Sequence, residues 1–166
     1  MRVRDATPDD AAWVVALNAA SEPHVGPMDQ AHYLALSAMA AALRVAEADE
    51  TPLGVAILFA PGAAYGSENY RWFEENAPRS LYVDRVMVAA SAYRRGVGKA
   101  LYEDALALCE ALELEGVAAE VNDAPPNPVS MAFHTSFDFE TLTVRPLRDG
   151  DKRVAMLYRP RVLEKV

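Results

Sequence analysis

The chain has 166 residues, of which 52% are hydrophobic, and a formal net charge of −8 at pH 7. This length allows one domain with a sizeable buried core, and the hydrophobic content argues against disorder. The acidic balance argues against a nucleic-acid-binding protein, which should be basic, and suits a cationic partner such as an amine. We therefore expect a single domain over residues 1–166 that binds no nucleic acid.

Cysteine usage and the N-terminal sequence bear on the compartment. A single cysteine, Cys109, excludes an internal disulfide framework, so a reducing compartment is the default. The N-terminus, MRVRDATPDD, lacks the apolar core of a signal peptide, and no apolar run approaches the roughly 18 residues of a membrane span. His24 and His32 show no metal-ligand spacing. We expect a cytoplasmic protein without a membrane segment or a metal site.

The N-terminal third predicts a strand followed by two helices. Residues 1–6 could form a short strand. Thr7-Pro8-Asp9-Asp10 then predicts a helix start, because Thr caps a helix, Pro fits its first turn and Asp suits the positive end of its dipole. Residues 28–40 are rich in Ala, with apolar residues at helical spacing, and predict a second helix.

The next segment predicts a hairpin and a long connection. Apolar runs at 43–48 and 53–60 flank a polar, Pro-bearing connection, which is typical of a hairpin. Residues 61–79 form a long link with a short helix expected in NYRWFEEN. A link of this length often covers a site.

The stretch 81–101, LYVDRVMVAASAYRRGVGKAL, predicts a strand, a loop and a helix start. Residues 81–88 are mostly apolar and rich in Val and Tyr, as buried strands are. From Val97 the apolar residues follow helical spacing, and Gly116 could end that helix as a C-terminal cap.

The C-terminal part predicts one more strand–helix pair and two closing strands. Residues 117–121 predict a strand that carries Glu120, and Asn127-Pro128 predicts the start of a short helix over 128–136. Residues 139–144 and 153–158 predict two strands around a turn at 148–151. This order of elements predicts an α/β (α+β) fold with a mixed central sheet.

Three cations, Arg94, Arg95 and Lys99, lie at the predicted start of the long helix. Cations are disfavoured at the positive end of a helix dipole, so their presence indicates a bound anion. Exposed amides, the dipole and two glycines would form a phosphate cradle there. The alternative is a solvated basic turn before an ordinary helix.

Two familiar phosphate loops do not fit this stretch. A P-loop would need Gly at Tyr93 and Ser or Thr at Ala100, and a dinucleotide-binding loop would need Gly at Leu101. The pattern that fits is R-x-x-G-x-A, with Arg95, Gly98 and Ala100. It resembles the pyrophosphate loop of the GNAT superfamily of acetyl-CoA-dependent N-acetyltransferases.

A second stretch, NPVSMAFHTSFDF at 127–139, strengthens the resemblance. Many GNAT proteins have here an Asn, a small residue three positions later, a pair such as Leu-Tyr, and then Gly-Phe. This chain has Asn127, Ser130, Phe133-His134 and Asp138-Phe139. The usual Tyr is therefore His134, and the usual Gly is Asp138.

The resemblance covers most of the chain and implies a GNAT fold, with a mixed, mostly antiparallel central sheet flanked by helices. It implies acetyl transfer from acetyl-CoA to a primary amine on a small molecule or a protein, and it allows a homodimer. The residues expected to hold the cofactor are Met87, Val88, Arg94, Arg95, Gly96, Val97, Gly98, Lys99, Ala100, Asn127, Phe133 and His134.

The implied chemistry needs a base, a proton donor and stabilisation of the thioester oxygen. Glu120 is the first candidate base and Asp84 the second, because a carboxylate can take the proton of the amine. Asp84 could instead pair with a nearby Arg, and Glu120 could be a surface residue. Strand alternation predicts that Tyr82, Asp84, Val86 and Val88 face the same way. Backbone N–H groups near Val88 would polarise the thioester.

His134 stands where the family's Tyr often donates a proton to the leaving thiolate, so it is the candidate acid. Its other reading is a helix histidine that satisfies a local hydrogen bond. Three rival functions stay open: a non-catalytic acyl-CoA sensor, a protein that binds another phosphate compound such as a nucleotide, and a protein–protein scaffold. The acceptor contacts are expected in the loops 21–30 and 61–79.

Overall fold

The computed structural model describes residues 1–148 and 150–162, and its strands form one seven-stranded sheet. The sheet order is β1-β2-β3-β4-β5-β7-β6. β4 and β5 pair in parallel, and every other neighbouring pair of these strands is antiparallel. The expected mixed, mostly antiparallel sheet is confirmed. The strands are β1 Arg2–Asp5, β2 Ala42–Ala48, β3 Thr51–Phe59, β4 Ser80–Val88, β5 Gly116–Ala124, β6 Glu140–Pro146 and β7 Arg153–Pro160.

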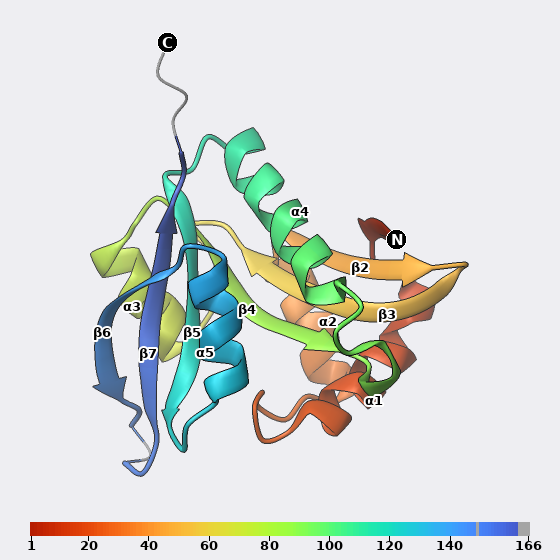
Figure 1. Ribbon diagram of the computed structural model, residues 1–166, viewed down its shortest axis with the longest axis horizontal. Helices are drawn as coiled ribbons and strands as arrows, with labels where there is room; N and C mark the ends of the chain where they lie inside the picture. The colour runs from red at the N-terminus through yellow and green to blue at the C-terminus, as the bar shows by residue number, and fades with distance from the viewer. Residues whose placement is uncertain (149, 163–166) are drawn as a thin grey trace.

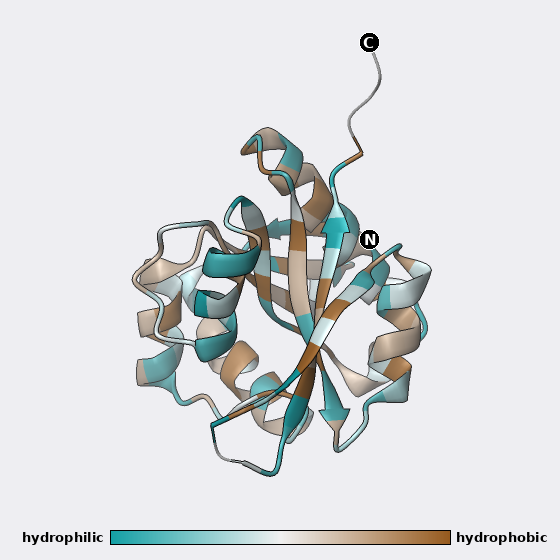
Figure 2. Cartoon of the chain, turned by 90° about the vertical axis from the view of Figure 1, so that its left-hand side faces the viewer, coloured by the Kyte–Doolittle hydropathy of each residue, from teal (hydrophilic) through white to brown (hydrophobic). Residues whose placement is uncertain are grey.

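Helices cover both faces of the sheet (Figure 1). They are α1 Ala11–Ser21, α2 Gln30–Met39, α3 Glu68–Asn76, α4 Val97–Ala111 and α5 Pro128–Ser136, with 3₁₀ turns η1 Pro8–Asp10 and η2 Ala90–Ala92. One core cluster lies between the sheet and α4 and α5, and the other between the sheet and α1, α2 and α3. Figure 2 shows hydrophobic residues gathered on the central strands. Within the described ranges, no helix has the length and apolarity needed to cross a bilayer.

Local hydrogen bonds explain the N-terminal elements. The predicted helix start at Thr7 is a 3₁₀ turn: the Thr7 amide donates to the Asp10 carboxylate at 2.7 Å, and the Asp10 amide donates to the Thr7 carbonyl at 3.0 Å. The predicted hairpin is present. Its turn is shorter than expected, because Asp49 and Glu50 alone adopt positive φ angles of 49° and 60° and β3 begins at Thr51.

Turns were expected at Gly116 and at 148–151. Gly116 is not the C-cap of α4, because the helix ends at Ala111 and the chain turns at Glu113, where φ is 54°. Gly116 instead opens β5, where a Cβ would lie 2.4 Å from the ring of Tyr158. The turn predicted at 148–151 includes residue 149, which lies outside the described residues.

A β-bulge at Asp84 changes which side chains share a face of β4. Ile57 and Leu58 of β3 stand opposite Arg85 and Val83, so Asp84 is an extra residue. As a result, Tyr82 packs in the cluster under α1, α2 and α3, whereas Val86 and Val88 pack against the opposite cluster. The prediction of one shared face for these residues was wrong, because it assumed unbroken alternation.

The parallel pair β4–β5 separates before either strand ends. Its pairing runs from Ser80 opposite Gly116 to Val83 opposite Ala119, while the strands continue to Val88 and Ala124. Figure 1 shows the two strands diverging below the start of α4. We call this region the β4–β5 fork. Val88 of β4 and Glu120 of β5 border it.

Candidate active site

The loop between β4 and α4 exposes backbone amides at the start of the helix. Arg94 and Gly96 have positive φ angles of 61° and 80°, and Gly96 is the N-cap of α4. The amide of Ala100 makes the first bond within the helix, to the Gly96 carbonyl at 3.0 Å. The amides before it therefore have no partner inside the helix. They belong to Val97, Gly98 and Lys99.

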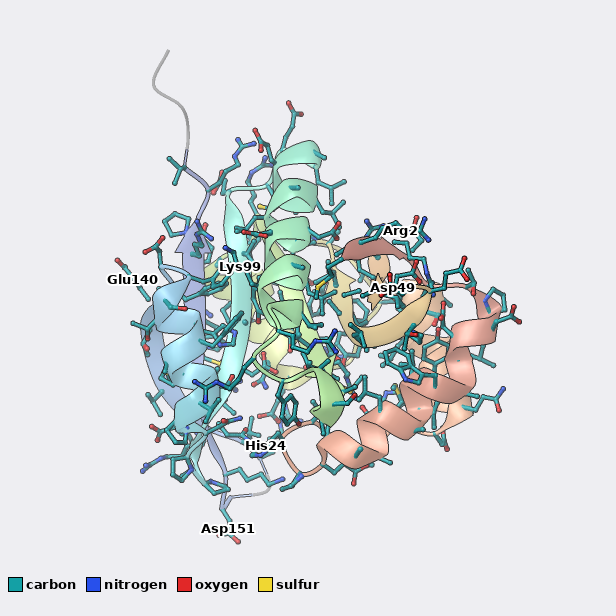
Figure 3. All side chains as sticks on the ribbon, turned by 45° about the vertical axis from the view of Figure 1, so that its right-hand side comes forward. Arg2, His24, Asp49, Lys99, Glu140 and Asp151 are labelled. Carbon is teal, nitrogen blue, oxygen red and sulfur yellow. The ribbon has the colours of Figure 1, made fainter. Side chains whose placement is uncertain are left out.

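The cations predicted at this loop are exposed around those amides. Arg94, Arg95 and Lys99 all lie on the surface (Figure 3 labels Lys99). Lys99 Nζ lies 3.6 Å from Glu103 Oε1, a loose contact within one helix turn. In the part of the chain that the structure describes, Arg94 and Arg95 form no ion pair. Their charge and the helix N-terminus together favour an anion here.

Close packing fixes the start of α4 against the sheet and α5. A Cβ on Gly54 of β3 would lie 2.6 Å from Val97 Cγ1 and 3.0 Å from the Met87 carbonyl oxygen, so the absence of a side chain lets α4 approach. A Cβ on Gly98 would lie 3.5 Å from the ring of Phe133 on α5. Packing against β3 and α5 thus fixes the positions of the predicted loop residues Val97 and Gly98.

Asn127 caps α5 beside this loop. Its side-chain oxygen accepts from the Ser130 amide at 3.2 Å, and its side-chain nitrogen lies 3.4 Å from His24 Nδ1 (Figure 3 labels His24). His24 belongs to the loop between α1 and α2. Asn127 therefore joins α5 to a segment that the sequence predicted on the acceptor side.

Backbone alternation points Val88 into the β4–β5 fork. The Ala89 amide donates to the Leu53 carbonyl of β3 at 2.8 Å. Successive residues of a strand direct their N–H and C=O groups to opposite edges, so those of Val88 point away from β3 and toward the fork. The side chain of Met87 is 2% exposed and packs under α1 and α2, which leaves the backbone of this segment as the surface for a ligand.

Glu120 lies on β5 at the fork, on the face of α1, α2 and α3. Its Oε1 accepts from the Tyr82 hydroxyl at 2.9 Å, and its Oε2 is shielded from solvent without a hydrogen-bond partner among the described residues. Burial, and then the negative charge of Asp84, raise the pKa of Glu120 to about 8, although Tyr82, Asn69 and the charge of Arg85 lower it. A carboxyl with this pKa can exchange a proton near neutral pH.

Asp84, the second candidate, is engaged on both carboxylate oxygens. The hydroxyl of Tyr65 donates to one oxygen, and Arg85 Nε donates to the other at 2.7 Å. The side chains of Asp84 and Arg85 are 5% and 7% exposed, so this is a buried ion pair. The alternative named from the sequence, in which Asp84 pairs with a nearby Arg, describes this geometry.

Arg85 and Tyr65, which sequence reasoning did not assign to the site, connect two loops to β4. Arg85 Nη1 donates to Asn18 Oδ1 at 2.7 Å and to the Gly26 carbonyl at 3.2 Å. Tyr65 stacks on Phe59 with ring centroids 4.2 Å apart. The loops predicted at 21–30 and 61–79 therefore both reach the Asp84 bulge. The predicted length of the second loop was the available signal for Tyr65.

His134 lies inside an aromatic cluster between α4 and α5 and is 6% exposed. Its Nδ1 lies 2.7 Å from the Ser130 carbonyl, and its Nε2 lies 2.6 Å from the Tyr102 hydroxyl. Because a carbonyl can only accept, Nδ1 carries the proton and Nε2 accepts from Tyr102. Burial lowers the pKa of His134, which keeps this neutral form. Both ring nitrogens are thus engaged within the protein.

Several solved structures share this fold. Ard1 from Thermoplasma volcanium is 19% identical with a TM-score of 0.77, covering 98% of each chain. The ribosomal-protein-S18-alanine N-acetyltransferase from Escherichia coli is 14% identical with a TM-score of 0.74, over 99% of this chain and 96% of that one. The structure of yncA from Salmonella typhimurium, solved with its cofactor acetyl-CoA, is 17% identical with a TM-score of 0.72, over 100% and 96%.

Sequence comparison identifies the family. No curated protein matches the chain. The sequence profile described as the acetyltransferase (GNAT) family matches residues 11–139, which include the cation-rich loop, Glu120 and α5. The expected resemblance is confirmed. The chain belongs to the GNAT family of acetyltransferases, which take their acetyl group from acetyl-CoA.

Proposed function

We propose that this acetyltransferase moves the acetyl group of acetyl-CoA directly to a primary amine, with Glu120 as the base. One observation carries the proposal: a shielded carboxylate oxygen, Glu120 Oε2, lies without a partner at the β4–β5 fork. An amine that attacks a thioester must lose a proton, and alkyl ammonium groups have pKa values of about 10. A carboxyl whose pKa is about 8 is suited to take that proton near neutral pH.

The residues at the start of α4 fit the pyrophosphate of acetyl-CoA. The free amides of Val97, Gly98 and Lys99 would bind its oxygens, and Arg94 and Arg95 would neutralise its charge. Gly96 has no side chain and Ala100 has a small one, so both let a ligand approach the backbone. Acetyl-CoA supplies a thioester, whose acetyl group is activated for attack by an amine.

The backbone of Val88 would perform two tasks at the fork. Its N–H and C=O groups point away from β3, so they can bind an extended pantetheine arm in the manner of an added strand. The same N–H is a candidate donor to the thioester oxygen as negative charge develops there. Met87 would not contact the arm, because its side chain is buried and, by the same alternation, its N–H and C=O groups point to β3. Asn127 and Phe133 would border the arm from α5.

Asp84 and His134 receive supporting roles in this proposal. Because Arg85 and Tyr65 already bind both oxygens of Asp84, this carboxylate is suited to hold charge rather than to take a proton. His134 is suited to fix α5 on α4 through Tyr102. Positioning of Phe133 beside Gly98 would depend on that contact.

A non-catalytic acyl-CoA sensor is the second candidate function. It is favoured by the engagement of His134, since the residue at the position of the family's usual proton donor has no free proton to offer. The two functions differ in one observable property. A sensor binds acetyl-CoA without releasing CoA when an amine is added.

Two measurements on the wild-type protein test the proposal. Thermal unfolding with acetyl-CoA, and with ATP as control, should show stabilisation by acetyl-CoA alone; a ligand at one hundred times its dissociation constant contributes about 2.7 kcal/mol. Release of CoA thiol is then followed with a panel of primary amines. Stabilisation together with amine-dependent CoA release supports the enzyme. Stabilisation without release from any amine supports the sensor instead.

A further inference from the structure

Two carboxylates, Asp84 and Glu120, lie near each other, and one cation, Arg85, is bound to the first of them. Asp84 lies near enough for its charge to act on Glu120, and both residues face α1, α2 and α3. Arg85 gives its Nε to Asp84 and its Nη1 to Asn18 and Gly26. The cation of this group is therefore bound to Asp84. The charge of Arg85 acts on Glu120 from a distance, but Glu120 forms no ion pair within the part of the chain that the structure describes.

A second cation that contacts α3 on this face of the sheet is also engaged. Arg145 of β6 donates to Asn69 Oδ1 at 3.2 Å, and its Nη2 lies 3.9 Å from Glu68 Oε1. Asn69 in turn is among the groups that lower the pKa of Glu120. A ligand with a negative group close to its amine would thus meet Asp84 and Glu120, while Arg85 and Arg145 are held by acceptors of the protein.

Each of the two carboxylates contacts a tyrosine that belongs to one aromatic cluster. Tyr65 and Tyr82 present their hydroxyls to Asp84 and Glu120, respectively. Phe59 stacks on Tyr65, and Tyr70 lies 5.6 Å from Tyr65 and 5.5 Å from Tyr82 by ring centroid. Aromatic faces attract organic cations and bind apolar carbon. Phe59, Tyr70 and Tyr82 are buried and pack on one another, so the half-buried ring of Tyr65 is the one in this cluster that can contact the hydrocarbon part of an amine.

We propose that the acceptor is an aliphatic amine that has no carboxylate beside its nitrogen and that enters as the ammonium ion, with Glu120 Oε2 as the acceptor of its N–H. This inference rests on the proposed function. One N–H bond of the ammonium breaks and an O–H bond forms on Oε2, which frees the nitrogen lone pair for attack on the thioester. Asp84, neutralised by Arg85, stays ionised throughout. Free α-amino acids are poor acceptors, because their carboxylate would lie against Asp84 and Glu120 without a free cation.

The test compares acceptors that differ only in the substituent on the carbon that bears the amine: hydrogen, carboxylate or carboxamide. Phenethylamine, phenylalanine and phenylalaninamide are supplied to the wild-type enzyme with acetyl-CoA, and tyramine and tyrosine form a second pair. The amine should exceed the amino acid in kcat/KM by about tenfold or more, since a like charge at this distance is strongly disfavoured. The amide, which keeps the bulk without the charge, should resemble the amine. An amino acid as active as its amine, or an amide as poor as the acid, overturns the proposal.

A variant that removes the charge of Asp84 tests whether this carboxylate causes the preference for amines. Asp84→Asn should reduce the preference for the amine over the amino acid by about threefold or more, whereas Glu110→Gln, which removes an exposed carboxylate on α4, should leave it unchanged. Melting temperatures show whether each variant folds; if Asp84→Asn does not, the wild-type comparison decides alone. Unchanged preference in a folded Asp84→Asn overturns the proposal.

Failure of this inference is separable from failure of the proposed function. If none of the five acceptors releases CoA while acetyl-CoA still raises the melting temperature, the acceptor class is wrong and donor binding stands. If other amines from a wider panel then react, the acetyltransferase function stands as well. If acetyl-CoA gives no stabilisation, both proposals fall together.

Discussion

The two sides of the β4–β5 fork are built from different parts of the polypeptide. The side we assign to the donor, residues 88–100, consists of backbone amides and exposed cations within one short stretch. The side we assign to the acceptor consists of buried side chains that come from distant segments: Tyr65, Asp84, Arg85 and Glu120, with Asn18 behind them. A pyrophosphate can be bound by any helix start of the right shape, but an acceptor must be recognised by its own functional groups.

This difference predicts which property each substitution changes. Changes at the acceptor side should alter catalysis while acetyl-CoA binding persists. Changes at the donor side should weaken acetyl-CoA binding for every acceptor. A variant that changes both properties equally would show that the two sides are coupled.

The largest expected effect is that of Glu120→Gln. Glutamine keeps the shape and the bond from Tyr82 but cannot take a proton, so kcat should fall by about 10²–10³-fold. The acetyl-CoA dissociation constant, measured by calorimetry, should stay within about twofold of wild type. Glu110→Gln is the matched control on an exposed part of α4. Retention of most activity by Glu120→Gln would assign the base elsewhere.

Charge reversal at the loop is expected to have the next effect. Arg95→Glu should raise the acetyl-CoA dissociation constant by about 10–100-fold, because a charge-assisted bond to phosphate is lost and a repulsion is added. The control is Arg79→Glu, an equal charge change at the opposite end of β4, where the side chain is 58% exposed. Equal weakening by both variants would mean that net charge, rather than this loop, attracts the donor.

A backbone substitution tests how α4 is positioned. Gly54→Ala would place a Cβ 2.6 Å from Val97 Cγ1, so the start of α4 must shift. We expect a loss of about 1–3 kcal/mol in the free energy of unfolding and weaker acetyl-CoA binding. Gly66→Ala, where a Cβ has its nearest contact at 4.0 Å, should leave acetyl-CoA binding unchanged. Normal binding by Gly54→Ala would contradict the packing argument.

The smallest effect on catalysis is expected at the His134 pair. Tyr102→Phe removes the hydroxyl that His134 Nε2 accepts at 2.6 Å, so stability should fall by about 1–2 kcal/mol as measured by chemical unfolding. The value of kcat should stay within about twofold, because this proposal gives His134 no proton to transfer. A large loss of kcat at normal stability would restore the acid role that the resemblance implies.

The same contrast explains what the sequence could predict. The loop and helix start at 94–100 were predictable because their glycines and cations are contiguous, and local patterns also predicted the mixed sheet and the short helix α3. Glu120 was named as a candidate base because the resemblance implies a base at this position of the strand in some family members. The Asp84 bulge could not be predicted, because it arises from the register between β3 and β4. The contacts of Arg85 with Asn18 and Gly26 join residues 59 or more positions apart, which a pattern within one segment does not reveal.

The central claim, that Glu120 takes the proton of the acceptor, is tested most directly by the pH dependence of kcat/KM. Burial and Asp84 raise the pKa of Glu120 to about 8, and the base must be ionised to act. The rate should therefore rise with pH, with a limb at about pH 8 in the wild type. Glu120→Gln should lose this limb together with most of the rate. A wild-type rate that is independent of pH between about 6 and 9, or a limb that persists in Glu120→Gln, would contradict the account.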